Sequence, residues 1–369
     1  MSDLRAQYLN RRHFQGLDGI RCVAILAVLW HHSSPPTPLP IFSRGFFGVD
    51  LFFVLSGFLI STLLLREKAA NGRISLKNFW MRRALRLIPA YYLVLFALLA
   101  AYSILKPGSE ETESLWSGFP AYALYFSNWI DPHFPNLGPT WSLATEEQFY
   151  LVWPLFEAFA APIVSAAAIV VGVIINQLIN FGLLDGAIQS MIGWTPAEHP
   201  EILQTTFTPI LLGVGLAHAL DSQSTHNLVR QIVGFRHASI VYAVILIALL
   251  NIPASNISGA MRLALHLAAT LFIGSIIVAP TSGLTKALEW KPISFVGAIS
   301  YGMYLYHMFG LHIASVILQK IGVDASVMKF FLGCAITIVA SAASYFFYEK
   351  RFLDLRRKFR SAQTISDDH

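Results

Sequence analysis

The chain has 369 residues, of which 55% are hydrophobic and 13% are charged, with a formal net charge of +5. Because a soluble domain carries about 25% charged residues, this composition excludes a soluble enzyme, a disordered chain and a nucleic-acid-binding module. The two cysteines lie in apolar runs, so neither a disulfide framework nor a metal site is predicted. The fold class expected is an all-α integral membrane protein.

Apolar runs predict about ten transmembrane helices, since a hydrocarbon core of about 30 Å needs roughly 20 apolar residues in a helix. In chain order the runs lie near 17–34, 46–65, 88–105, 142–160, 161–181, 202–220, 237–254, 259–279, 293–318 and 327–349. The first run leads into His31 and His32 without a small-residue cleavage site, so it is not a cleavable signal peptide.

The positions of Lys and Arg predict the orientation, because cytoplasmic segments are enriched in both. With the N-terminus inside, most of them fall on the cytoplasmic side, chiefly in the 66–86 loop and near the two ends of the chain. Both termini are therefore expected to be cytoplasmic. The expected division is a cytoplasmic arm at 1–16, a transmembrane domain at 17–355 and a basic cytoplasmic tail at 356–369.

The long outer loop at 106–141 is rich in acidic and aromatic residues. One interpretation is an interfacial segment of the aromatic belt. The alternative is a lid or re-entrant element over a site that faces outward.

Ionisable side chains at membrane depth are costly, so each is a candidate functional residue. At 1.5 Å per residue, His32 lies about 22 Å into the first span and His307 about 21 Å into the ninth. Asp50 and Glu146 lie roughly 6 Å below the outer interface. These four side chains are therefore expected to meet in one layer. An imidazole beside a carboxylate can take a proton from a hydroxyl there.

Two of these residues have structural alternatives. Asp50 can cap the start of its helix. His307 can belong to a hydrogen-bond ladder with Ser300 and Tyr304, which share its helix face.

A second cluster of candidates is basic and cytoplasmic. Arg83 and Arg86 share a helix face just before the third span, and Arg21 enters its own span from the same side. These arginines can bind lipid phosphates. Alternatively, they can grip a phosphorylated donor.

Five motifs occur in order along the chain: GLDGIRCVAILAVLWHH, FFGVDLFFVLSGFLI, FWMRRALRLIPAYY, GPTWSLATEEQFYLVWP and ISYGMYLYH. Together they resemble the membrane-bound acyltransferase-3 family, whose members O-acylate polysaccharides, lipids and other envelope or secreted molecules. The resemblance runs from about Gly16 to Leu355 and is strongest over 16–154 and 294–307. It implies a fold of about ten transmembrane helices and a donor acyl-CoA, most often acetyl-CoA, supplied from the cytoplasm.

The resemblance also implies roles for individual residues. The family's Arg-then-His motif falls on Arg21 and His32, so His32 inherits the catalytic role, as general base or as transient acyl carrier. Glu146 is expected to orient His32 and balance its charge. The RxxR motif falls on Arg83 and Arg86, which with Arg21 are expected to hold the phosphates of coenzyme A. The residues expected to contact substrate or support the site are Asp50, Trp141, Ser142, Ser300, Tyr301, Tyr304 and His307.

The implied partners are acyl-CoA, the lipid bilayer and a hydroxyl-bearing glycan, lipid or secreted acceptor. No permanently bound cofactor and no nucleic acid are expected, and the implied location is the bacterial inner membrane. The chain departs from many members at Glu349-Lys350-Arg351, where they have Glu-x-Pro. Members with a fused extracytoplasmic SGNH domain are longer, so that domain is not expected in this chain.

A proton-coupled transporter or exporter that uses the same buried residues is the main alternative function. Transporter folds often contain paired broken helices in two related halves, and the sequence offers no such pair. A scaffold or flippase without enzymatic activity is a third possibility.

Overall fold

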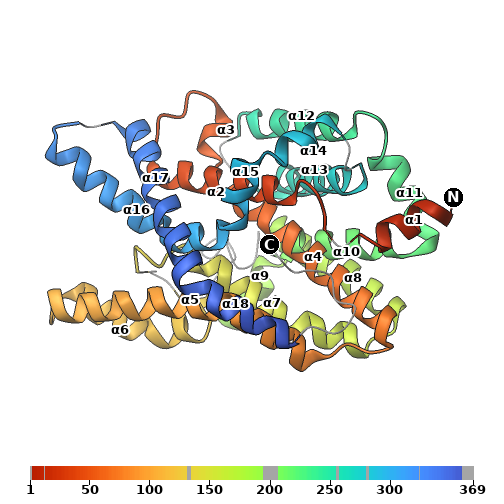
Figure 1. The fold of residues 1–369 in the computed structure, drawn as a ribbon, viewed down its shortest axis with the longest axis horizontal. Coiled ribbons are helices and arrows are strands. Elements are labelled where there is room, and N and C mark those ends of the chain that lie inside the picture. Colours follow the sequence, from red (N-terminus) through yellow and green to blue (C-terminus); the bar gives the residue numbers. More distant parts are fainter. Residues whose placement is uncertain are drawn as a thin grey trace.

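The computed structural model describes residues 2–11, 13–130, 134–193, 207–254, 257–279, 282–323 and 325–359, and every regular element in these ranges is helical (Figure 1). The first half contains α1 (Ser2–Leu9), α2 (Leu17–Ser33), α3 (Pro40–Ser43), α4 (Phe47–Asn71), α5 (Leu76–Leu105), α6 (Glu110–Ala123), the 3₁₀ turn η1 (Ser127–Trp129), α7 (Thr140–Phe159), α8 (Pro162–Asn180) and α9 (Asp185–Ile192). The second half contains α10 (Phe207–Asp221), α11 (Gln223–Val233), α12 (Ala238–Asn251), α13 (Gly259–Val278), α14 (Gly283–Leu288), α15 (Lys291–Ala298), α16 (Ser300–Lys320), α17 (Ser326–Ser344), the π-helix η3 (Tyr345–Glu349), α18 (Lys350–Arg356) and the 3₁₀ turn η4 (Arg357–Phe359).

Several helices have the length and apolar character of membrane spans. Within the described ranges, five pass on both counts: α4, α5, α8, α13 and the segment Ser326–Phe359. The pair α11 and α12, bent by 70°, makes a sixth if it is one span. Helix α7 is 20 residues long but carries three glutamates, so the polar groups of the expected site lower its apolarity. The helices support a multi-pass membrane protein.

Each apolar run coincides with a helix, with two differences in extent. Helix α5 begins at Leu76 rather than near residue 88, so the arginines that precede the third apolar run are helical. The run at 293–318 is broken at Ile299 into α15 and α16. The run at 202–220 corresponds to α10, and residues 202–206 lie outside the described residues.

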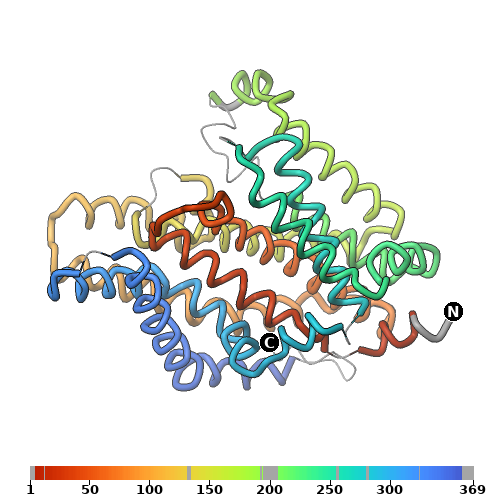
Figure 2. Tube along the Cα trace, turned by 90° about the horizontal axis from the view of Figure 1, so that it is seen from above, coloured from red at the N-terminus to blue at the C-terminus, as the bar shows by residue number. Residues whose placement is uncertain are grey.

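Helices α2 and α4 run through the middle of the molecule, between the α15–α17 group on one side and α10 with α13 on the other (Figure 2). Glycines allow the close approach of these helices, as small residues do in membrane bundles. A Cβ on Gly48 would collide with the carbonyl oxygen of Ala24 in α2, and a Cβ on Gly57 would collide with that of Ile210 in α10. The glycines of the FFGVDLFFVLSGFLI motif therefore serve helix packing.

The outer loop contains helix α6, which folds back along the second half of α5. Thr112 donates to the carbonyl of Tyr102 at 3.2 Å, and Tyr91 donates to the carbonyl of Tyr122 at 2.8 Å. The chain has thus returned to the middle of α5 by the end of α6. This path keeps α6 against α5, and α7 then begins inside the bundle, at the buried Thr140.

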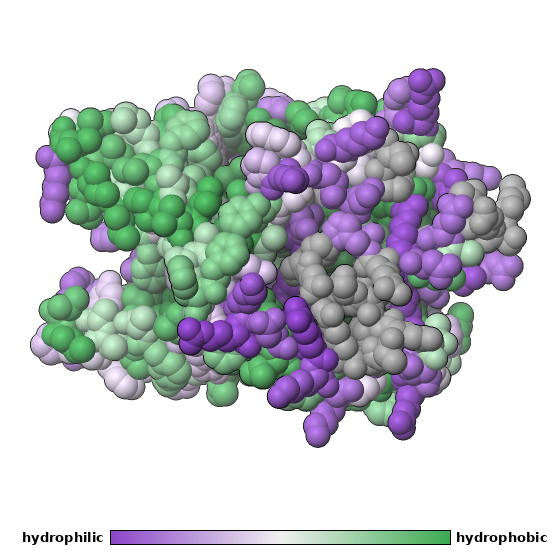
Figure 3. All heavy atoms as spheres, viewed as in Figure 1, coloured by the Kyte–Doolittle hydropathy of each residue, from purple (hydrophilic) through white to green (hydrophobic). Residues whose placement is uncertain are grey.

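Basic side chains tie several helix ends together at one end of the molecule. Arg66 at the end of α4 donates to the carbonyls of Tyr8 and Arg11, and Lys68 donates to those of Glu157 and Ala160. In Figure 3 the hydrophilic residues gather over the right of the molecule. The left is mostly hydrophobic, with a hollow between the α16–α17 lobe and the α5–α6 lobe. The uneven distribution of charged residues along the sequence therefore corresponds to an uneven distribution of hydrophilic residues over the folded molecule.

Candidate active site

Most of the expected site residues line one interior space, which we call the central cavity, of about 90 Å³. Its polar walls come from five helices: Arg21, Ser56, Arg83, Arg86, Ser142, Glu146, Tyr150, Ser300, Tyr301 and Tyr304. The fold thus brings the three expected arginines and Glu146 to the same cavity.

Two further spaces adjoin the central cavity. The basic cavity, of about 260 Å³, shares Arg86 and Tyr301 with it. The histidine cavity shares Leu143 and Tyr304 with it and includes His307. Because neighbouring cavities have walls in common, the three lie in a row.

Along both α16 and α5, successive residues line the three cavities in the same order. On α16, Tyr301 borders the basic and central cavities, Tyr304 borders the central and histidine cavities, and His307 borders the histidine cavity. The rise from Tyr301 to His307 is about 9 Å. On α5, Arg86 lines the basic and central cavities and Tyr91 the histidine cavity. The row therefore leads from the basic end of the bundle into its interior.

Glu146 accepts a 2.6 Å hydrogen bond from the hydroxyl of Ser56, which holds its carboxylate against α4. One turn further along α7, the ring of Tyr150 lies under the guanidinium of Arg83, 5.0 Å from its centroid. Arg21 pairs with Asp18 of its own helix at 2.6 Å. The central cavity thus combines a carboxylate with positioned arginine side chains.

The expectation that Glu146 contacts His32 is wrong for this structure: no hydrogen bond or ion pair joins the two side chains within the described part of the chain. The reason is the start of α7. Because α6 returns along α5 first, α7 begins inside the bundle, so a count of residues from Ser142 does not give the position of Glu146. Glu146 consequently lies one turn beyond Ser142, in the direction of the arginines.

His32 instead faces His307, with 4.9 Å between the ring centroids and an angle of 62° between the planes. The Nδ1 of His32 lies 3.0 Å from the carbonyl oxygen of Val28, and the Nδ1 of His307 lies 2.6 Å from that of Tyr304. A carbonyl oxygen only accepts hydrogen bonds, so both Nδ1 atoms carry a proton. The Nε2 atoms are thereby left as proton acceptors. His307 is fully buried, and its Nε2 has no hydrogen-bond partner among the described residues.

Tyr304 separates the central cavity from the histidine cavity. Its hydroxyl donates to the carbonyl of Pro139 at 2.9 Å and lies 2.6 Å from the hydroxyl of Ser142. Its ring lies 5.4 Å from that of His307. Ser300, which was expected to join His307 in a hydrogen-bond ladder, lines the central cavity. Helix α16 therefore presents polar side chains to two different cavities instead of forming one ladder.

Asp50 does not belong to this site. Its carboxylate pairs with Arg262 at 2.9 Å and lies 3.5 Å from His266, both on α13. The helix is capped at Phe46 without a side-chain hydrogen bond, so Asp50 is not the cap either. The expected single layer of four side chains is therefore wrong, because Asp50 faces α13.

Two other expected site residues, Trp141 and Tyr301, contact neighbouring helices beside the cavity. Trp141 packs edge-on against Phe53, with 6.1 Å between the ring centroids. Tyr301 donates to the carbonyl of Leu87 at 2.8 Å, which joins α16 to α5 beside the central cavity.

Sequence reasoning missed several residues of the site. Asp18 could have been predicted as the partner of Arg21 from its i, i+3 spacing on the same helix. No sequence pattern identifies Ser56 or Tyr150, because their role depends on how α4 and α7 pack. No group of three metal-ligating side chains occurs in the described ranges.

The comparisons with known proteins agree with one family. The Acyltransferase domain family matches residues 14–346. The peptidoglycan O-acetyltransferase OatA of Listeria monocytogenes is 29% identical over 94% of this chain and 56% of its own length. YrhL of Bacillus subtilis, provisionally named a peptidoglycan O-acetyltransferase, is 28% identical over 92% and 55%. A Staphylococcus aureus (strain COL) protein provisionally named an O-acetyltransferase is 30% identical over 94% and 58%.

The chain therefore spans little more than half the length of these curated relatives. No solved structure gives a significant match.

Proposed function

The chain belongs to the Acyltransferase domain family, and from this membership we propose that it is a membrane O-acyltransferase. It moves an acyl group, acetyl foremost, from cytoplasmic acyl-CoA to a hydroxyl of an acceptor. The names of OatA and YrhL support a cell-wall glycan as the acceptor class. A lipid-linked sugar carries the same kind of hydroxyl.

The proposed topology has about ten transmembrane helices, with both termini in the cytoplasm of a bacterial cell and the chain in the inner membrane. Two observations support it. Each apolar run coincides with a helix, and the basic side chains that tie helix ends together gather at one end.

The observation that carries the proposal is the row of cavities from the basic end to His307, whose ring faces that of His32. A thioester donor has charged phosphates at one end and its reactive carbonyl at the other, joined by a narrow pantetheine arm. The order of the cavities matches the order of those parts. Arg21, Arg83 and Arg86 meet the phosphorylated end, and the acyl group lies toward Tyr304, which borders the small histidine cavity of about 10 Å³.

The chemistry proposed uses the Nε2 of His32. This atom accepts the proton of the acceptor hydroxyl while the hydroxyl oxygen attacks the thioester carbonyl carbon. The carbon–sulfur bond then breaks, the sulfur receives the proton from His32, and an ester and free coenzyme A leave. If His32 instead carries the acyl group transiently, the same Nε2 is the attacking atom.

Other residues of the row position the reactants. Glu146, held by Ser56, accepts hydrogen bonds from the amides of the pantetheine arm and balances the charge of Arg83. The hydroxyl of Tyr304 lies between the two inner cavities and can turn its proton from the carbonyl of Pro139 to the oxyanion of the tetrahedral intermediate.

A thioester-consumption assay tests this function. The full chain, purified in lipid nanodiscs, is given acetyl-CoA with and without peptidoglycan fragments, and both free thiol and acceptor mass are measured. The expected result is acceptor-dependent thiol release with addition of one acetyl group to the fragment. A proton-coupled transporter would leave the thioester intact, and that outcome would exclude the transferase.

A further inference from the structure

We propose that the basic cavity, formed by α18, the π-helix η3 and the first half of α5, binds the nucleotide phosphates of the donor. The residues assigned are Lys350, Arg356 and Arg357, together with Arg86. This inference rests on the proposed function and adds the cations of α18 and η4 to Arg21, Arg83 and Arg86 as groups that hold the 3′-phosphate and pyrophosphate of coenzyme A. Neither the arginine motif nor the comparisons assign a role to α18.

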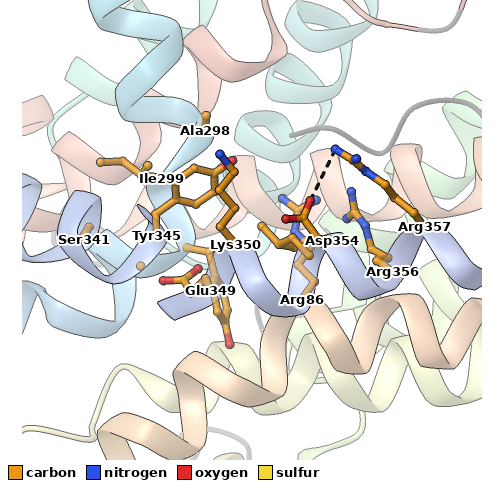
Figure 4. A pocket seen from close by; sticks show the side chains of 13 residues that line it. Arg86, Ala298, Ile299, Ser341, Tyr345, Glu349, Lys350, Asp354, Arg356 and Arg357 are labelled. Carbon is orange, nitrogen blue, oxygen red and sulfur yellow. Dashed lines mark ion pairs between the residues drawn. The ribbon is translucent and has the colours of Figure 1, made fainter. Parts of the chain in front are cut away.

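The charges around the basic cavity favour an anion. Figure 4 shows Lys350, Arg356 and Arg357 on the C-terminal helical segment, with Arg86 approaching from α5. The carboxylates in the wall are those of Glu349 and Asp354. With four cations and two carboxylates, the wall carries a net positive charge.

The carboxylates already have partners within the protein. Asp354 pairs with Arg357 at 3.5 Å. Glu349 accepts a 2.7 Å hydrogen bond from Ser344, whose hydroxyl in turn accepts one from Tyr306 at 2.9 Å. Glu349 is thus directed toward α16. The wall nevertheless keeps an excess of two positive charges over its carboxylates, which favours an incoming phosphate.

The local helix geometry helps to form the cavity. The π-helix from Tyr345 to Glu349 joins α17 to α18, and both of its end residues line the basic cavity. Such single π-turns occur frequently at functional sites. The departure at Glu349-Lys350-Arg351 from the family pattern therefore lies at the wall of this cavity.

A separate contact holds η4, which directly follows α18, against α5. Arg82 donates to the carbonyl of Phe359 at 2.8 Å and pairs with Glu67 at 3.2 Å. Arg86 lies one turn further along α5, on the same face of that helix. The two cationic walls are thus fixed relative to each other before any ligand arrives.

The connection to the central cavity distinguishes a coenzyme from a lipid headgroup. Arg86 and Tyr301 are shared by both cavities, so a ligand anchored in one can extend into the other. The volume of about 260 Å³ is below the roughly 300–1,000 Å³ of pockets that take a whole drug-sized ligand. It suits one end of coenzyme A, whose arm then enters the protein interior.

The test compares two double variants in phosphatidylcholine nanodiscs, which contain no anionic headgroup. Lys350→Gln with Arg357→Gln removes two cations of the cavity, and both residues are exposed enough for the helix to tolerate the change. The control, Arg351→Gln with Lys358→Gln, removes two exposed cations that do not line it. Calorimetry measures binding of coenzyme A and of pantetheine, which lacks every phosphate.

The cavity variant should bind coenzyme A about tenfold more weakly or worse, since hydrogen bonds to charged groups are lost, and should bind pantetheine as the unmodified protein does. The control variant should keep its affinity for both. Equal affinities of the two variants for coenzyme A would overturn this inference while leaving the transferase proposal intact. Failure of the unmodified protein to bind coenzyme A would overturn both.

A second arm repeats the titration in phosphatidylglycerol nanodiscs. If the cavity holds a lipid phosphate, the cavity variant will keep its affinity for coenzyme A in phosphatidylcholine and lose only the effect of the anionic lipid. That result would also overturn the inference. Persistence of the affinity difference in both lipids would support it.

Discussion

The imidazoles of His32 and His307 face each other from α2 and α16, 4.9 Å apart between ring centroids. Each ring is held through its Nδ1 by a backbone carbonyl of the preceding turn, from Val28 and from Tyr304. Backbone carbonyls therefore orient both rings without a carboxylate. This pairing replaces the histidine–glutamate pair expected from the sequence, and it leads to the first prediction.

Replacing His32 with alanine should lower acyl transfer by about 10²–10⁴-fold, the usual contribution of a general base. The side chain is only partly buried, so the variant should still fold. The measurement is thiol release from acetyl-CoA in nanodiscs. His31→Ala is the matched control, because His31 is the adjacent, more exposed imidazole. Full activity in His32→Ala would remove this residue from the mechanism.

Replacing Ser56 with alanine should raise the KM for acetyl-CoA by roughly tenfold or more, with a smaller effect on kcat. The hydroxyl donates to a carboxylate, and such a bond contributes about 1.5–3 kcal/mol. Initial rates at varied donor concentration separate the two constants. Ser56→Thr keeps the hydroxyl and should recover much of the loss; a fall in kcat alone would instead assign Glu146 to the chemical step.

Replacing Asp50 with alanine should destabilise the protein by about 3–5 kcal/mol, because it leaves Arg262 as a buried charge without its partner. Thermal unfolding in detergent measures the effect. The specific activity of the correctly folded fraction should be unchanged, since Asp50 lies away from the row of cavities. A folded variant that has lost its activity would return Asp50 to the catalytic site.

Replacing Gly57 with alanine should destabilise the protein by about 1–3 kcal/mol, the usual effect of overpacking. The new methyl group would collide with the backbone of α10 at Ile210. Gly186→Ala is the control, because nothing lies within 4 Å of its would-be Cβ on α9. Equal unfolding temperatures for the two variants would show that α4 and α10 can move apart without cost.

The sequence predicted the helices well where one apolar run makes one helix. It failed for α6, which was expected to be a loop. A signal was nevertheless present: Ser109 caps the helix by accepting from the backbone N–H of Thr112, and Glu110 and Glu111 follow in the first turn. Overlooking that helix led to the expectation that Glu146 contacts His32, which the structure does not show.

The candidate site was predictable as a set of residues but not as a geometry. Motif positions identified the side chains that line the central cavity, including Arg83, Arg86 and Tyr304. The basic cavity was not foreseen, because the π-helix and the position of α18 depend on tertiary contacts such as that of Arg82 with Phe359. Side-chain chemistry is local in sequence, whereas the walls of a cavity are shared by distant segments.

The closure at Tyr304 has a consequence for the energetics of the cell. Its hydroxyl donates to the carbonyl of Pro139, which precedes α7, and lies beside the hydroxyl of Ser142, between the central cavity and the histidine cavity. A protein that opened a continuous wet channel between the two faces of an energised membrane would short-circuit the proton gradient. The hydrogen-bonded tyrosine keeps these two cavities apart and so opposes such a leak.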